Sequence, residues 1–232
     1  MLHYFIWNGV NSKTKHIRVN NRVPIVRPEE RVEHVTIPGR AGELTQVEGE
    51  DIYNSYIQTV NMEVIGAANV PAAEAWLKGS GVVTFDCQAT LQQNARIINA
   101  VTFQKISRNL DIWSADVQFY CEPVKGLIAE TDIEVTSSGA TLTNPGTLPA
   151  FPEIQMEGSG AVSIQIDGKT LVIPSLTSGW TADCENRWIC QNGTPQWNAW
   201  TGDFPQIPVG TSTILFTGGI TKLTITPHWR YL

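Results

Sequence analysis

The chain has 232 residues, 42% of them hydrophobic, which is enough to bury a sizeable core in one large or two small domains. Its formal net charge of -6 at pH 7 argues against nucleic-acid binding, which needs a basic face to contact phosphates. No apolar run approaches the length of a membrane span, and residues 1–5 lack the basic region and apolar core of a secretory signal. We therefore expect no nucleic-acid partner, no membrane insertion, and assembly in a cytoplasm.

Charge is unevenly divided along the chain. Residues 1–135 hold 12 Lys and Arg and 16 Asp and Glu, whereas residues 136–232 hold 4 and 6, and together these counts give the totals of 16 and 22. A sparsely charged segment that is rich in Thr, Ser, Gly and Pro is typical of a β-sandwich with many turns. The sequence thus predicts two domains, 1–135 and 136–232, with proline and glycine punctuating the junction.

The first domain is predicted to consist of strands around one short helix. Alternation of apolar and polar residues marks the strands, because successive side chains of a strand point to opposite faces. The predicted strands are Tyr4–Asn8, His16–Asn20, Arg31–Ile37, Tyr56–Ile65, Val82–Cys87, Ile97–Ile106 and Trp113–Cys121.

One helix is predicted among these strands. It begins after Asn69 and ends at Gly79, since a proline in the first turn and a glycine at the end are common helix boundaries. Ala73, Trp76 and Leu77 fall at the i, i+3 and i+4 positions of one face. We expect this face to pack on the sheet.

Two glycine-containing dipeptides predict hairpins in the second domain. Asp167-Gly168 is expected to form a two-residue turn that places Ile164 opposite Leu171 and so creates one apolar face on both strands. Gly218-Gly219 is likewise expected to turn the chain between two further strands.

The stretch Ile37–Leu44 ends a strand-like run with a rigid, glycine-rich, positively charged turn. Proline cannot continue a strand ladder, and glycine reaches backbone angles that other residues avoid. Alone, such a turn is an ordinary surface feature. It is followed by the helix and strand of Pro71–Cys87, by Trp113–Pro123, and by a β-rich second half that opens near Asn144-Pro145-Gly146. In this order the segments resemble the distal tail proteins of long-tailed, non-contractile bacteriophages over nearly the whole chain.

The resemblance implies a mainly β (α+β) fold. In that family the N-terminal domain, with one short helix, forms a homohexameric ring, and the C-terminal domain is a galectin-like β-sandwich that points outward. The ring sits at the distal tip of the virion tail, between the tail tube protein and the tail-tip or tail-associated lysin protein, and in some relatives it helps to hold receptor-binding proteins. The resemblance therefore implies a structural hub of the baseplate, with Pro38, Gly39, Arg40 and Gly42 as candidate assembly residues.

Signatures of catalysis and of cofactor binding are absent from the sequence. There is no nucleophile elbow, helical His-Glu metal pair or phosphate-binding glycine loop, so no catalytic residue, cofactor or enzymatic activity is predicted. The four cysteines form no Cys-x-x-Cys pair and the four histidines are scattered, so no metal site is predicted. A disulfide between Cys184 and Cys190 is not expected in a reducing compartment.

Five of the eight tryptophans lie in the second domain. Tryptophan is a large core or interface residue and also a platform for sugars, and we favour the core or interface interpretation. The galectin sugar-binding run Trp-x-x-Glu-x-Arg is not found. Two alternatives to the hub stay open: a carbohydrate-binding protein that recognises a bacterial cell-wall polymer, and a divergent hydrolase. The candidate aromatic surface consists of Trp188, Trp197 and Trp200.

Overall fold

The computed structural model describes residues 3–47 and 49–232, so the first two residues of the segment considered above as a signal lie outside it. The chain forms two compact units, one reaching Ile128 and including Leu232, the other Ala129–Tyr231. The boundary precedes the predicted one, because β12 (Ile133–Val135) pairs with β20 (Gly210–Thr226) and so belongs to the second unit. Both units are built mainly from strands, and the described residues contain one short α-helix, which confirms the fold class. Within this part of the chain, no helix is long and apolar enough to cross a membrane.

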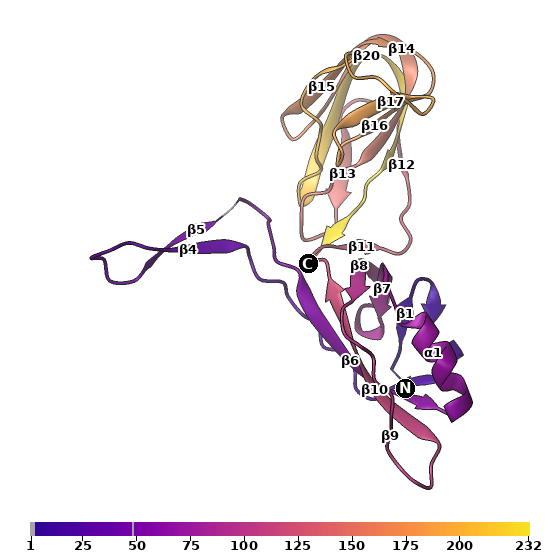
Figure 1. The fold of residues 1–232 in the computed structure, drawn as a ribbon. Helices are drawn as coiled ribbons and strands as arrows, with labels where there is room; N and C mark the ends of the chain where they lie inside the picture. The colour runs from indigo at the N-terminus through magenta and orange to yellow at the C-terminus, as the bar shows by residue number, and fades with distance from the viewer. Residues whose placement is uncertain (1–2, 48) are drawn as a thin grey trace. The chain divides into compact units, whose positions relative to one another are not determined.

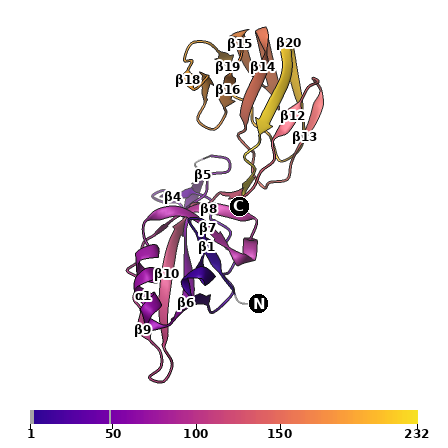
Figure 2. The ribbon, with the colours of Figure 1, turned by 90° about the vertical axis from the view of Figure 1, so that its right-hand side faces the viewer.

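The first unit is built on one sheet with the strand order β2-β1-β7-β8-β10-β6-β3. Its two longest strands, β6 and β10, pair antiparallel over their whole length and lie side by side in both views (Figures 1 and 2). Short strands β9 (Gln104–Lys105) and β11 (Lys125–Leu127) pair with β10 and β8. The main strands are β1 (Phe5–Trp7), β2 (Val10–Asn11), β3 (Ile17–Val19), β6 (Tyr56–Ile65), β7 (Ser80–Phe85), β8 (Leu91–Ile97) and β10 (Ile112–Cys121).

Helix α1 (Val70–Trp76) packs on this sheet, as its sequence predicts. Ala73 is fully buried and Leu77, which follows the helix, is 4% exposed. The Trp76 ring stacks on Phe5, with ring centroids 5.5 Å apart and an interplanar angle of 11°. The apolar face of the helix therefore closes the core of the first unit. Short 3-10 turns adjoin the strands and helix at Ser12–Lys15, Ala67–Asn69 and Asp86–Gln88.

The prediction of one long strand over Ile97–Ile106 is wrong. The chain leaves the sheet after Ile97 and the ladder resumes only in β9. Asn99 explains the break: its side-chain amide donates to the Asp116 carbonyl (2.9 Å) and accepts from the Gln118 amide (2.8 Å). A side chain thus makes the hydrogen bonds that a strand would make to β10. The prediction for Cys87 is also corrected, because this half-buried residue lies in a 3-10 turn after β7.

The second unit is a curled sheet organised by two long strands, β14 (Glu153–Ile166) and β20, which pair with each other. The first part of β14 also pairs with β16, and its last part with β15. Apolar side chains along both parts are buried, and no helix occurs in this unit to cover them. The two parts of the sheet must therefore cover each other. The remaining strands of this sheet are β13 (Ala140–Asn144), β15 (Lys169–Leu176), β16 (Trp180–Asp183), β17 (Trp188–Gln191), β18 (Thr194–Pro195) and β19 (Thr201–Gly202). The short strand β21 (Arg230–Tyr231) is not part of it.

The hairpin predicted at Asp167-Gly168 is confirmed. Ile164 pairs with Leu171, and both turn residues have positive φ angles of 51° and 74°, as a two-residue hairpin turn with matching twist requires.

The prediction of a hairpin at Gly218-Gly219 is wrong. Strand β20 runs through both glycines and keeps its pairing with β14, with register shifts after Glu157 and after Ser159 of β14. A Cβ atom on Gly218 would overlap the carbonyl oxygen of Ala161, and one on Gly219 would overlap that of Ser159. These glycines therefore permit close approach of two backbones at a β-bulge instead of a reversal of the chain.

Candidate functional site

A two-stranded hairpin projects from the sheet of the first unit (Figure 1). Its strands, β4 (Val32–Thr36) and β5 (Glu43–Val47), pair with each other and form a sheet of their own. Backbone hydrogen bonds hold its base, from the Arg31 amide to the Ile52 carbonyl (2.9 Å) and from the Asn54 amide to the Glu29 carbonyl (2.8 Å). We call residues 29–47 and 49–54 the arm.

The four candidate assembly residues lie together in the turn at the tip of the arm. Gly39 and Gly42 have φ angles of 82° and 83°, which favour glycine, and a Cβ atom on either would meet no other atom within 4 Å. The Arg40 amide donates to the Ile37 carbonyl at 3.1 Å, and Pro38 to Gly42 are exposed. The turn therefore presents the Arg40 side chain at an exposed tip. Its role in assembly stays a prediction.

The arm exposes apolar side chains and unpaired strand edges. All five residues of β5 are exposed, and Val47, Leu44 and Ile37 are exposed by 53%, 43% and 38%. An isolated two-stranded hairpin is marginally stable in water, and open strand edges are templates for pairing with another chain. The arm therefore has the physical character of an element that another surface covers.

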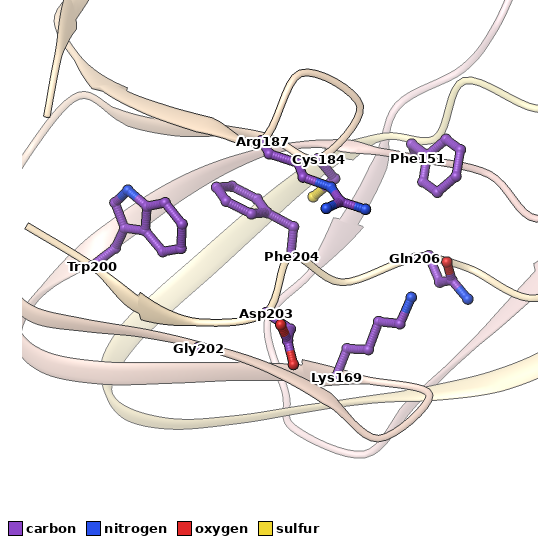
Figure 3. Close-up of a pocket in the computed structure, with 9 residues that line it drawn as sticks. All are labelled: Phe151, Lys169, Cys184, Arg187, Trp200, Gly202, Asp203, Phe204 and Gln206. Atoms are coloured by element: carbon purple, nitrogen blue, oxygen red, sulfur yellow. The ribbon is translucent and has the colours of Figure 1, made fainter. Parts of the chain in front are cut away.

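A second feature is a cavity of about 290 Å³ in the second unit (Figure 3). Lys169 at the start of β15, Arg187 in the turn between β16 and β17, and the segment around β19 supply its walls. The lining mixes two cations, one carboxylate, an amide and aromatic rings. The lining residues are Phe151, Lys169, Cys184, Arg187, Trp200, Gly202, Asp203, Phe204 and Gln206.

Asp183 organises the turn that carries Arg187. Its carboxylate accepts hydrogen bonds from the Asn186 backbone amide (2.9 Å), the Asn186 side chain (2.8 Å) and the Trp188 indole (2.9 Å). Burial raises the pKa of Asp183, but these hydrogen bonds outweigh it and hold the pKa below its ordinary value. Arg187 follows with a φ angle of 56°. The turn is thus fixed by a carboxylate that stays ionised near neutral pH.

The opposite end of the cavity is aromatic. The Trp200 and Phe204 rings meet edge to face, with centroids 4.6 Å apart. Gly202 lies between them in sequence and pairs with Leu171 so closely that a Cβ atom on it would overlap the Thr170 carbonyl oxygen. This tight pairing fixes the aromatic segment against β15.

The tryptophans of the second unit occupy different environments. Trp180 and Trp229 are 5% and 8% exposed and belong to the interior. Trp188 is half-buried, Trp200 lines the cavity, and Trp197 is 71% exposed. The combined aromatic surface of Trp188, Trp197 and Trp200 stays a prediction. Sequence reasoning missed Lys169 and Arg187, for which the only signal was the scarcity of cations in this half of the chain.

The described residues form no candidate centre for metal binding or thiol chemistry. In residues 3–47 and 49–232, no group of three or more His, Cys, Asp or Glu side chains is placed to hold a metal ion. Cys184 and Cys190 are free thiols, and burial, with a smaller effect of the neighbouring Asp183, raises the pKa of Cys184 to about 12. The Cys184 thiol is therefore a protonated core group.

Comparison with known proteins shows a fold in common with one solved class. No family model and no curated protein sequence matches the chain. Over its entire length, its fold is similar to that of a solved bacteriophage tail protein. One solved structure with this fold is the SPP1 Dit (gp 19.1) protein, described as a paradigm of the hub adsorption apparatus in phages that infect Gram-positive bacteria. The TM-score is 0.76 at 17% sequence identity, and the match covers 100% of both chains. The resemblance stated from sequence is thereby confirmed at the level of the fold.

Proposed function

We propose that the chain is a structural distal tail protein that builds the adsorption hub at the tip of a phage tail. The observation that carries this proposal is the match of both units, in order and over the whole of both chains, to the SPP1 Dit protein. That relative is described as a hub component, which supports a role without catalysis. The proposed location is the virion tail, after assembly in the host cytoplasm.

In this proposal the first units of six copies close a ring. A ring needs one head-to-tail surface that is used once by each copy, so a single projecting element and a single receiving surface suffice. The arm is the candidate projecting element, since its apolar residues and open edges lack a cover within the described chain. Arg40 at its tip would add a bidentate contact to a carboxylate or to backbone carbonyls of the neighbouring copy.

The ring would join the tail tube protein on one side to the tail-tip or tail-associated lysin protein on the other. The second units would face outward and could anchor receptor-binding proteins. These partners follow the family arrangement that the sequence resembles, and the whole-length fold match supports them.

Oligomeric state tests the proposal. The purified full chain is examined by light scattering and negative-stain electron microscopy over a range of concentrations, and tails from producing cells are labelled with an antibody against the chain. We expect six-fold rings and label at one tail tip. A matched variant in which a short glycine-serine turn replaces residues 32–47 should remain folded and monomeric. A wild-type chain that stays monomeric at high concentration and is absent from tails would contradict the hub function.

A further inference from the structure

The second unit concentrates its few cations around the cavity of Figure 3. Residues 129–231 contain only four Lys and Arg. Lys222 is engaged elsewhere, 2.9 Å from Glu157 and 3.6 Å from Glu134. Lys169 and Arg187 line the cavity, and Arg230 lies 4.7 Å from the centre of the Phe151 ring in its wall. Two of the four cations therefore line one cavity in an acidic protein, and a third stacks on a ring of its wall and donates to the Pro149 carbonyl at 3.1 Å.

The two lining cations converge. Figure 3 shows the Lys169 ammonium and the Arg187 guanidinium pointing into the same space from opposite walls, with the Gln206 amide beside them. Asp203 is the one carboxylate among the lining residues, so the walls are net cationic. Like charges that face each other raise the free energy of the empty site, and an anion placed between them lowers it. The guanidinium fork also matches carboxylate and phosphate oxygens in pairs.

The aromatic end and the size of the cavity restrict the classes of ligand that it can hold. Trp200 is half-buried and meets Phe204 edge to face. Figure 3 shows Phe204 between Trp200 and the two cations, so the aromatic wall runs from the cationic end through Phe204 to Trp200. A volume of about 290 Å³ is at the small end of ligand pockets. It suits one ring with an anionic substituent better than an extended peptide. Asp203 and Gln206 supply the acceptors and donors that ring hydroxyls need.

We infer that this cavity binds a negatively charged sugar unit that carries a phosphate or a carboxylate. The anionic group lies between Lys169 and Arg187, and the sugar ring extends along the aromatic wall of Phe204 towards Trp200. Hydroxyl groups of the sugar bond to Asp203 and Gln206. This binding activity goes beyond the proposed hub function and does not depend on it.

Binding to the full chain is measured by calorimetry and by shifts of the tryptophan indole NMR signals. The probes are glucose 1-phosphate, glucuronic acid, uncharged glucose and inorganic phosphate. We expect the charged sugars to bind about tenfold more tightly than glucose, as one well-placed charge-assisted contact provides. Lys169→Gln and Arg187→Gln should each remove most of this difference. The matched control is Lys222→Gln, which changes the net charge equally and should leave binding unchanged.

The aromatic wall is tested separately. Trp200→Ala should weaken glucose 1-phosphate and leave inorganic phosphate unaffected, whereas Trp197→Ala should alter neither. If Trp200→Ala lowers the thermal unfolding midpoint, the Trp200→Phe variant is used in its place. This variant keeps an aromatic ring and should retain sugar binding. Equal binding of glucose and charged sugars would overturn the inference. So would inorganic phosphate binding as tightly as glucose 1-phosphate, or saturable binding of a glutamate-rich peptide by a chain that binds no sugar.

Discussion

Gly218→Ala tests whether close backbone approach, and not turn geometry, selects the glycine in β20. Gly218 has a φ angle of 84°, and a Cβ atom there would overlap the Ala161 carbonyl oxygen and lie 3.0 Å from the Val162 Cα atom. Gly160 is a matched control on the partner strand, because its φ angle is 81° but a Cβ atom meets nothing within 4 Å. The two substitutions share the backbone cost and differ in the overlap.

The magnitudes follow from this difference. A left-handed conformation costs a residue with a Cβ about 1–2 kcal/mol, and this cost is common to both variants. Loss of glycine entropy in the unfolded chain offsets about 0.4–1 kcal/mol of it. Overlap with the opposite backbone adds about 1–3 kcal/mol for Gly218→Ala alone. We therefore expect Gly160→Ala to lose about 1 kcal/mol and Gly218→Ala about 2–4 kcal/mol.

Differential scanning calorimetry of the full chain is the suitable assay, because two units can unfold in separate transitions. Only the transition of the second unit should move, and it should move further for Gly218→Ala. Equal destabilisation by the two variants would refute the close-approach explanation. In that case Gly218 would be required only for its positive φ angle.

Three further predictions concern the first unit. Trp76→Ala should lower the free energy of unfolding by about 3 kcal/mol in denaturant titrations, because the half-buried ring stacks on Phe5; an unchanged midpoint would contradict this packing role. Lys125 is 3% exposed and its ammonium has no hydrogen-bond partner, so Lys125→Met should stabilise the protein by about 1–3 kcal/mol at pH 7. Burial lowers the pKa of Lys125, so the wild type should gain stability as the pH rises from this lowered pKa towards 10.5, and the advantage of the variant should shrink; an equal advantage at pH 7 and pH 10 would argue against this. Arg40→Ala and Arg40→Lys should leave the circular dichroism spectrum intact but reduce ring formation in light scattering, and normal rings from both would make Arg40 an ordinary surface residue.

Periodicity predicted the parts of the fold in which local pattern and burial agree. Tyr56–Ile65 alternates cleanly and is β6 with those bounds, and the helix face of Ala73 and Leu77 is buried as expected. The pattern failed where a side chain or a distant backbone decides. Asn99 ends a strand by bonding to β10, and that contact is not visible in the local sequence.

The two glycine-containing dipeptides show the same limit of prediction from local sequence. Asp167-Gly168 and Gly218-Gly219 look alike in sequence, yet the first turns the chain and the second lets β20 pass close to β14. A two-residue turn depends on the φ angles of two adjacent residues, and the residue types at those positions indicate which φ angles are accessible. Close approach is decided by a partner more than fifty residues away, which local residue type does not report.

The two candidate sites differ in the same way. The tip of the arm is a contiguous stretch, so its proline, glycines and arginine could be singled out from sequence as a surface turn, although the projecting hairpin that carries it could not. The cavity joins Lys169, Arg187 and Trp200 from three separate strands and turns, and none of them lies in a motif. The number of tryptophans drew attention to Trp188, Trp197 and Trp200 together, but only the fold separates a ring that lines the cavity from one that is 71% exposed. A site assembled by sheet pairing therefore becomes visible only when the register of the strands is known.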